Sequence, residues 1–153
     1  MKPVKATVQA LWYSTKKGWH SFTKIIGVSA CGRILSMSPS YPGSANDNTI
    51  MRETFEVLLS DAKDWEWAAA DKGFRNVHER ILTPPKDQKL ANDFSSIRIT
   101  VENTNAKIKK WAICRDRFRV APTVKNQQQL LEQHHRYYMI VAALVNIKYH
   151  GSS

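Results

Sequence analysis

Cysteine is nearly absent from this chain, which has only Cys31 and Cys114 among its 153 residues. Two thiols so far apart in sequence provide neither a disulfide framework nor a four-ligand zinc site, so we expect ordinary side chains in a reducing compartment. The longest apolar run, residues 139–145, is too short to cross a bilayer, and the N-terminal MKPVKATVQALWYSTKKG lacks the apolar segment of a signal peptide. These absences predict an intracellular protein, in the nucleus, the cytoplasm or an organelle, without a membrane partner.

Acidic residues are scarce as well. The chain has 13 Asp and Glu against 23 Lys and Arg, a net charge of +10 and an isoelectric point near 9.8. This balance favours an anionic partner, of which nucleic acid is the commonest large kind, although many basic proteins are merely soluble. We expect DNA or RNA as the partner, in a larger assembly or alone, and no small-molecule cofactor. With 42% apolar residues and no repeat or linker, residues 1–153 are expected to form a single domain.

The first third of the chain has the pattern of β strands. Two alternating, β-branched stretches at 20–28 and 33–38 flank a glycine-containing turn, which predicts a hairpin, and residues 8–14 are a candidate third strand. After the prolines that follow, Ser44 and Asp47 have the spacing of a capping box and predict a helix that reaches about residue 60.

The remaining elements alternate strands and helices. We expect a buried strand at 65–70 and another at 80–83, then an amphipathic helix at 94–111 and a last helix at 127–148. This order of strands and helices predicts a layered α/β or α+β domain.

Two acidic residues have contexts that allow chemistry. Asp71, in ADKGFRN, follows an apolar run and precedes a glycine, which is equally typical of a turn. Glu102 follows Val101 at the edge of the predicted buried face of a helix. Carboxylates that converge from different elements can hold Mg²⁺, and two such ions can clamp the oxygens of a phosphodiester. Their spacing in sequence does not establish that Asp71 and Glu102 meet.

Several motifs resemble one known family. They are YSTKKGWHSFTK at 13–24, GRILSMSPSYPGSANDNTI at 32–50, ADKGFRN at 70–76, ILTPP at 81–85, RITVENTNAKIKKW at 98–111 and RDRFR at 115–119. Their content and order resemble the DDE endonuclease domain of Harbinger-type transposases and related insertion-sequence transposases. The resemblance implies an RNase H-like α/β fold, a mixed sheet flanked by helices, that acts on DNA with Mg²⁺ or Mn²⁺. It also implies that Asp71 and Glu102 are two of the three metal-binding, catalytic carboxylates.

The chain departs from that family at the first carboxylate. Either Lys5 replaces the aspartate of the family, in which case its ammonium group would compete with the metal ion, or the chain begins after the strand that carries this aspartate. Both alternatives remove one of the three expected ligands. We expect no counterpart of the helical DNA-binding region that usually precedes the nuclease domain, and for Asp47 we favour a capping role. Enzymatic activity is therefore left open, and the alternative is a catalytically inactive descendant that serves as a nucleic-acid-binding or structural subunit of a larger, for example ribonucleoprotein, assembly.

Basic residues gather in two parts of the sequence, with tryptophans between them. Such residues can hold a phosphate backbone, although a solvated basic face around core tryptophans explains the same pattern. The histidines of the last helix, His134 and His135, point about 100° apart, so we expect surface positions for both and no shared metal. The candidate nucleic-acid-binding residues are Lys16, Lys17, Lys107, Lys109, Lys110, Arg115, Arg117 and Arg119.

Overall fold

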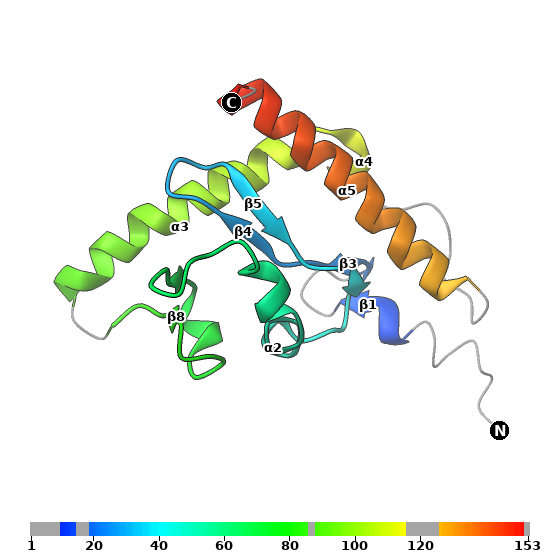
Figure 1. The fold of residues 1–153 in the computed structure, drawn as a ribbon. Helices are drawn as coiled ribbons and strands as arrows, with labels where there is room; N and C mark the ends of the chain where they lie inside the picture. Colours follow the sequence, from blue (N-terminus) through cyan, green and yellow to red (C-terminus); the bar gives the residue numbers. More distant parts are fainter. Residues whose placement is uncertain (1–9, 15–18, 86–87, 116–125, 152–153) are drawn as a thin grey trace.

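The computed structural model describes residues 10–14, 19–85, 88–115 and 126–151 and shows a mixed α/β architecture. A β hairpin forms the middle layer, with α3 and α5 on one side and α2 on the other (Figure 1). The α/β class is thus confirmed. Within the described ranges the strands form four two-stranded sheets, and the RNase H-like arrangement of one larger mixed sheet is compatible with them but remains an expectation.

The central hairpin pairs β4 (Ile26–Val28) with β5 (Ile34–Met37) in antiparallel orientation, as the sequence predicts. Its turn depends on Gly32, whose positive φ of 87° places the backbone in a conformation that favours glycine. A side chain there would also meet Thr104, whose hydroxyl donates a hydrogen bond to the Gly32 carbonyl at 3.1 Å. The turn is therefore joined directly to α3.

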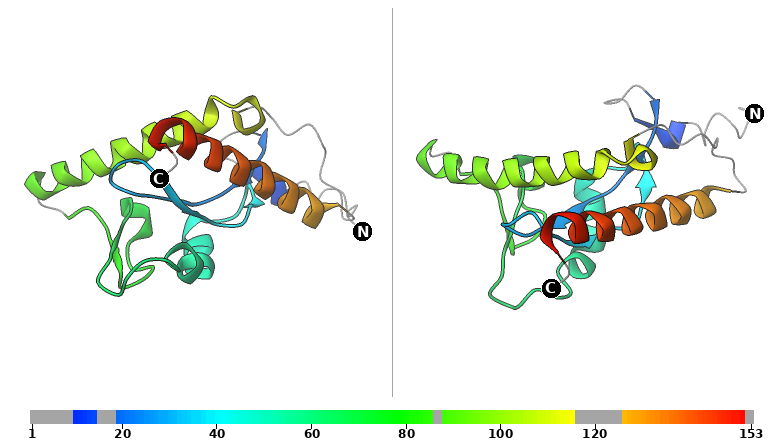
Figure 2. Two further views of the ribbon diagram at one scale, coloured as in Figure 1. Left: turned by 45° about the horizontal axis from the view of Figure 1, so that its top comes forward. Right: turned by 90° about the horizontal axis from the view of Figure 1, so that it is seen from above.

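Helices α3 (Gln88–Lys109) and α5 (Gln127–His150) cover one face of the hairpin. They run in roughly opposite directions, so that the end of α5 lies against the C-terminal half of α3 (Figure 2). Both expected helices are confirmed, with α3 beginning earlier than predicted. The core on this face consists of Ile34, Met37, Ile108, Val141, Ala142 and Val145.

Helix α2 (Asp47–Leu58) covers the opposite face through Met51, Phe55 and Leu58. The predicted cap by Ser44 and Asp47 is wrong. The N-cap is Asn46, whose extended backbone allows its side chain to accept a hydrogen bond from the Asn48 N–H at 2.8 Å. The Ser44 hydroxyl instead donates a hydrogen bond to the Leu11 carbonyl, and Asp47 is the first helical residue.

Two expected strands differ from the observed structure. Of residues 8–14, residues 10–12 are helical, residues 13–14 form β1, and residues 8–9 lie outside the described part. In place of the buried strand expected at 65–70 the structure has only β7 (Ala68–Ala69), because the Arg80 guanidinium binds the carbonyls of Lys63 and Glu66 and holds the preceding segment in turns.

The remaining elements are short. They are β1 (Tyr13–Ser14) paired with β2 (Trp19–His20), β3 (Phe22–Thr23) paired with β6 (Tyr41–Pro42), the parallel pair β7 (Ala68–Ala69) and β8 (Ile81–Leu82), the 3-10 helix η1 (Lys72–Phe74) and α4 (Ala112–Arg115). Among the helices that the structure describes, none has the length and apolarity needed to cross a bilayer.

Candidate functional site

Asp71 follows β7, the first strand of the parallel pair, with Ala70 between them, and lies where η1 begins. Its side chain is exposed, and Oδ1 accepts a hydrogen bond from the Lys72 N–H at 2.8 Å, which makes Asp71 the N-cap of η1. The turn role that the sequence allows is thus observed. A carboxylate has about four lone-pair directions, so this single bond leaves acceptor capacity for another ligand.

Glu102 lies on an exposed face of α3. Its carboxylate accepts a hydrogen bond from the Arg98 Nε at 3.0 Å. The two residues form a salt bridge across one turn of the helix. Both side chains are largely exposed, 67% for Arg98 and 60% for Glu102, so this ion pair adds little to stability. A metal ion at Glu102 would have to displace or share the Arg98 contact.

The donor set required for a divalent metal is not assembled by the described residues. Residues 10–14, 19–85, 88–115 and 126–151 contain no group of three His, Cys, Asp or Glu side chains placed to hold an ion. Mg²⁺ needs several well-placed oxygen ligands. Asp71 and Glu102, each bonded locally, do not by themselves fit the metal pair of a phosphodiester-cleaving site, and Lys5 lies outside the described residues.

The predicted basic residues that the structure describes lie where α3 ends and α4 begins. Lys109, Lys110 and Arg115 are exposed, and Lys107 is half-buried. Trp111 between them is 37% exposed, so it is not a core tryptophan, and part of its surface is accessible to solvent. The other predicted nucleic-acid-binding residues lie outside the described part of the chain: Lys16, Lys17, Arg117 and Arg119.

The histidines of α5 do not match the expectation of two surface side chains. His134 is only 8% exposed; its ring stacks on Phe22 with centroids 3.9 Å apart, and Nδ1 lies 2.8 Å from the Ser40 hydroxyl. Helical geometry explains the error, because divergent neighbours on a half-buried helix place one of the two side chains inward. His135 is half-buried and contacts Lys24.

Lys24 is a half-buried amine beside His135, and it was not among the candidate residues predicted from the sequence. Its Nζ lies 2.6 Å from His135 Nδ1 and donates a hydrogen bond to the Ser38 carbonyl at 2.7 Å. Burial lowers the pKa of the Lys24 amine from 10.5 to about 7, against a smaller opposing effect of Cys114. Burial, and then the Lys24 charge, also lowers the pKa of His135.

Tyr138 and Cys114 complete the surroundings of this amine. The Tyr138 hydroxyl donates to the Cys114 carbonyl at 3.1 Å, and burial raises the pKa of Tyr138 to about 12 and that of Cys114 to about 11. Both groups are therefore neutral near pH 7. A lysine within an alternating, strand-like stretch is the sequence signal for such a site.

Tryptophans before Asp71 are exposed rather than buried. Trp65 and Trp67 are 70% and 54% exposed, and the Lys63 Nζ lies 4.9 Å from the centroid of the Trp65 ring. This lone cation–π pair lies in the turns between α2 and β7.

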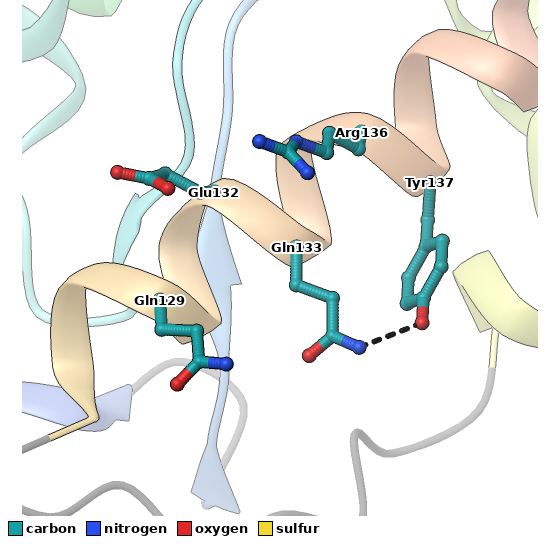
Figure 3. A pocket seen from close by; sticks show the side chains of 5 residues that line it. All are labelled: Gln129, Glu132, Gln133, Arg136 and Tyr137. Carbon is teal, nitrogen blue, oxygen red and sulfur yellow. Dashed lines mark hydrogen bonds between the residues drawn. The ribbon is translucent and has the colours of Figure 1, made fainter.

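A shallow hollow on α5 does not add a catalytic site. Figure 3 shows its lining, in which Gln133 donates a hydrogen bond to the Tyr137 hydroxyl at 2.8 Å. All lining residues belong to one helix, so no second element encloses a ligand there. They are Gln129, Glu132, Gln133, Arg136 and Tyr137.

Comparison with known proteins assigns a family to most of the chain. A family model described as DDE superfamily endonuclease matches residues 1–146 of this chain. Neither the curated proteins nor the solved structures contain a significant match.

Proposed function

The chain belongs to the DDE superfamily endonucleases, and from that membership we propose that it binds DNA through the basic end of α3 and α4. The observation that carries the proposal is the charge of this segment. Residues 103–115 include four basic side chains and no acidic one, and three of the four are exposed around the partly exposed ring of Trp111. Such a surface attracts phosphates without a need for base-specific contacts.

Salt dependence is the property that tests this proposal. Each lysine or arginine that neutralises a phosphate releases counterions. A plot of the logarithm of the binding constant against the logarithm of the salt concentration is therefore a falling line, and each such contact makes its slope steeper by about 0.9. We expect fluorescence anisotropy with a labelled DNA duplex to show such a decline for the wild-type protein. Arg115→Ala is expected to reduce the slope by roughly 1.

The result that contradicts DNA binding is equally concrete. No binding at low salt, or binding that does not change between low and high salt, would remove the proposal. Glu132→Gln is a control for charge changes elsewhere, because this exposed acid lies on α5 outside the basic segment; it is expected to retain the wild-type slope.

Metal-dependent DNA cleavage is the second candidate function. Its support is the family, whose members use divalent metals, together with the exposed carboxylate of Asp71, which lies close to the end of β7, one strand of a parallel pair. In this candidate Asp71 and Glu102 would contribute to holding Mg²⁺ or Mn²⁺, as the family resemblance implies.

Relaxation of supercoiled plasmid with Mg²⁺ or Mn²⁺ tests cleavage. Asp71→Asn keeps an acceptor for the Lys72 N–H but removes the charge, and Glu102→Gln removes the charge of the other candidate ligand. Both variants are expected to lose cleavage while Glu132→Gln retains it. A wild-type protein that never nicks plasmid, or variants that nick it equally well, would rule out this role.

A further inference from the structure

Three lysine side chains surround the ring of one tyrosine. The Nζ atoms of Lys107, Lys148 and Lys110 lie 4.7, 5.6 and 5.8 Å from the centroid of the Tyr149 ring. The Lys110 Nζ also donates a hydrogen bond to the Tyr149 hydroxyl at 3.4 Å. We call these four residues the Tyr149 cluster.

The cluster joins two helices that are separate in sequence. Lys107 and Lys110 belong to the end of α3, whereas Lys148 and Tyr149 belong to the last turn of α5. The helix dipole favours lysine near a helix C-terminus, which explains why each of the two helices has lysine in its last turn. The dipole does not explain why both ends direct their lysines at the same ring.

No acidic residue lies in the parts of α3 and α5 that are next in sequence to the Tyr149 cluster. Between Glu102 and Lys110, and again after Glu132, neither α3 nor α5 contains an aspartate or a glutamate. Three like charges around one ring repel each other, and an anion between them would relieve this repulsion. Tyr149 is half-buried and packs against the core under α5, so the ring is a fixed platform for the flexible lysine side chains.

We propose that the Tyr149 cluster binds a phosphodiester group of nucleic acid, with the ring of Tyr149 positioning the three ammonium groups. This inference rests on the proposed DNA binding and extends that interface from α3 and α4 onto the end of α5. It adds Lys148 and Tyr149 to the binding residues, and it assigns the uncharged ring a role in affinity that a diffuse basic surface would not require.

The chain offers a matched control. Lys63 and Trp65 form a cation–π pair of similar length, 4.9 Å, and in the described part of the chain no second lysine contacts that ring. Lys63 is exposed, as is Lys148, and both substitutions by alanine remove one positive charge. The control pair thus has one lysine at an aromatic ring outside the proposed interface, whereas three lysines converge on Tyr149.

The experiment measures binding of a labelled DNA duplex by fluorescence anisotropy across a salt series. Lys148→Ala is expected to weaken binding roughly threefold to tenfold and to reduce the salt slope by about 1, while Lys63→Ala remains close to wild type. Tyr149→Leu keeps an apolar side chain and the net charge, and we expect it to weaken binding about threefold because the lysines lose their platform. Trp65→Leu is its control, and circular dichroism of every variant checks folding.

Each outcome supports or overturns a specific statement. Wild-type protein that does not bind DNA overturns both the proposed function and this inference. Salt-dependent wild-type binding that Lys148→Ala and Tyr149→Leu reduce no more than their controls leaves the function in place and overturns the inference. If Tyr149→Leu melts at the wild-type temperature and binds less tightly, the effect lies in the phosphate site and not in the core.

Discussion

The contact between Asn146 and the hairpin allows a stability prediction of defined size. The Ile34 N–H donates to Asn146 Oδ1 at 2.9 Å, and Asn146 Nδ2 donates to the Ile34 carbonyl at 2.8 Å. One side chain of α5 thus satisfies both backbone groups of a β5 residue and takes the place of a neighbouring strand. The perturbation is Asn146→Leu, which keeps the size of the side chain and removes both hydrogen bonds.

The expected loss follows from the groups that remain. A buried backbone group left without a partner costs about 1–3 kcal/mol, and Ile34 would have two such groups. These hydrogen bonds are only partly buried, so water can replace part of them, and we expect the free energy of unfolding to fall by about 2–3 kcal/mol. With a typical urea dependence for a domain of this size, the unfolding midpoint would fall by about 1 M.

Urea unfolding followed by circular dichroism checks this value. Asn103→Leu is the matched control, since Asn103 is exposed on α3, and its effect is expected to remain within about 0.5 kcal/mol. Asn146→Asp, which keeps the acceptor and loses the donor, should fall between the two. If Asn146→Leu unfolds within 0.5 kcal/mol of the wild type, the side chain does not join α5 to the hairpin as the structure shows.

Two further predictions concern packing and pH. Ile108→Ala, at a site only 1% exposed, should lower the free energy of unfolding by about 2–5 kcal/mol, whereas Ile99→Ala, 55% exposed on the same helix, should change it little; thermal melts of both variants compare them. Because the folded state disfavours the protonated Lys24 amine, whose pKa burial lowers to about 7, this group makes the wild type more stable as pH rises from 7 toward 10.5. Lys24→Met should therefore be more stable than the wild type at pH 6 in urea unfolding, and an advantage that does not shrink at pH 9 would contradict this explanation.

Local sequence signals predicted the hairpin and the long helices well. The β4–β5 hairpin depends on alternation and on Gly32, both of which act over a few residues. Helices α3 and α5 have apolar periodicity over many turns, so both were predicted, although the first six residues of α3 were not. The cap of α2 was misplaced by two residues, since Ser44 and Asn46 are both good caps and only the backbone conformation selects between them.

Features that depend on distant contacts were not predictable in the same way. The segment around Trp65 and Trp67 has the composition of a buried strand, yet Arg80, fourteen residues after Glu66, holds it in turns and leaves both rings exposed. His134 is buried because Ser40 and Phe22 lie beneath α5. In each case the deciding partner is remote in sequence, and no periodicity encodes it.

For the candidate site, too, the sequence predicts the kind of partner but not which residues come together. Composition alone predicts an anionic partner, because acids are few and lysines many. It does not indicate that Lys110 would meet Tyr149, 39 positions later, since this contact exists only where α5 returns across α3. The two carboxylates favoured by motif resemblance are each bonded to a near neighbour in sequence, whereas the lysines of the Tyr149 cluster converge from two helices. Among the described residues, tertiary packing thus brings several lysines together but does not bring the acidic residues together. DNA binding is therefore the first proposal and cleavage the second.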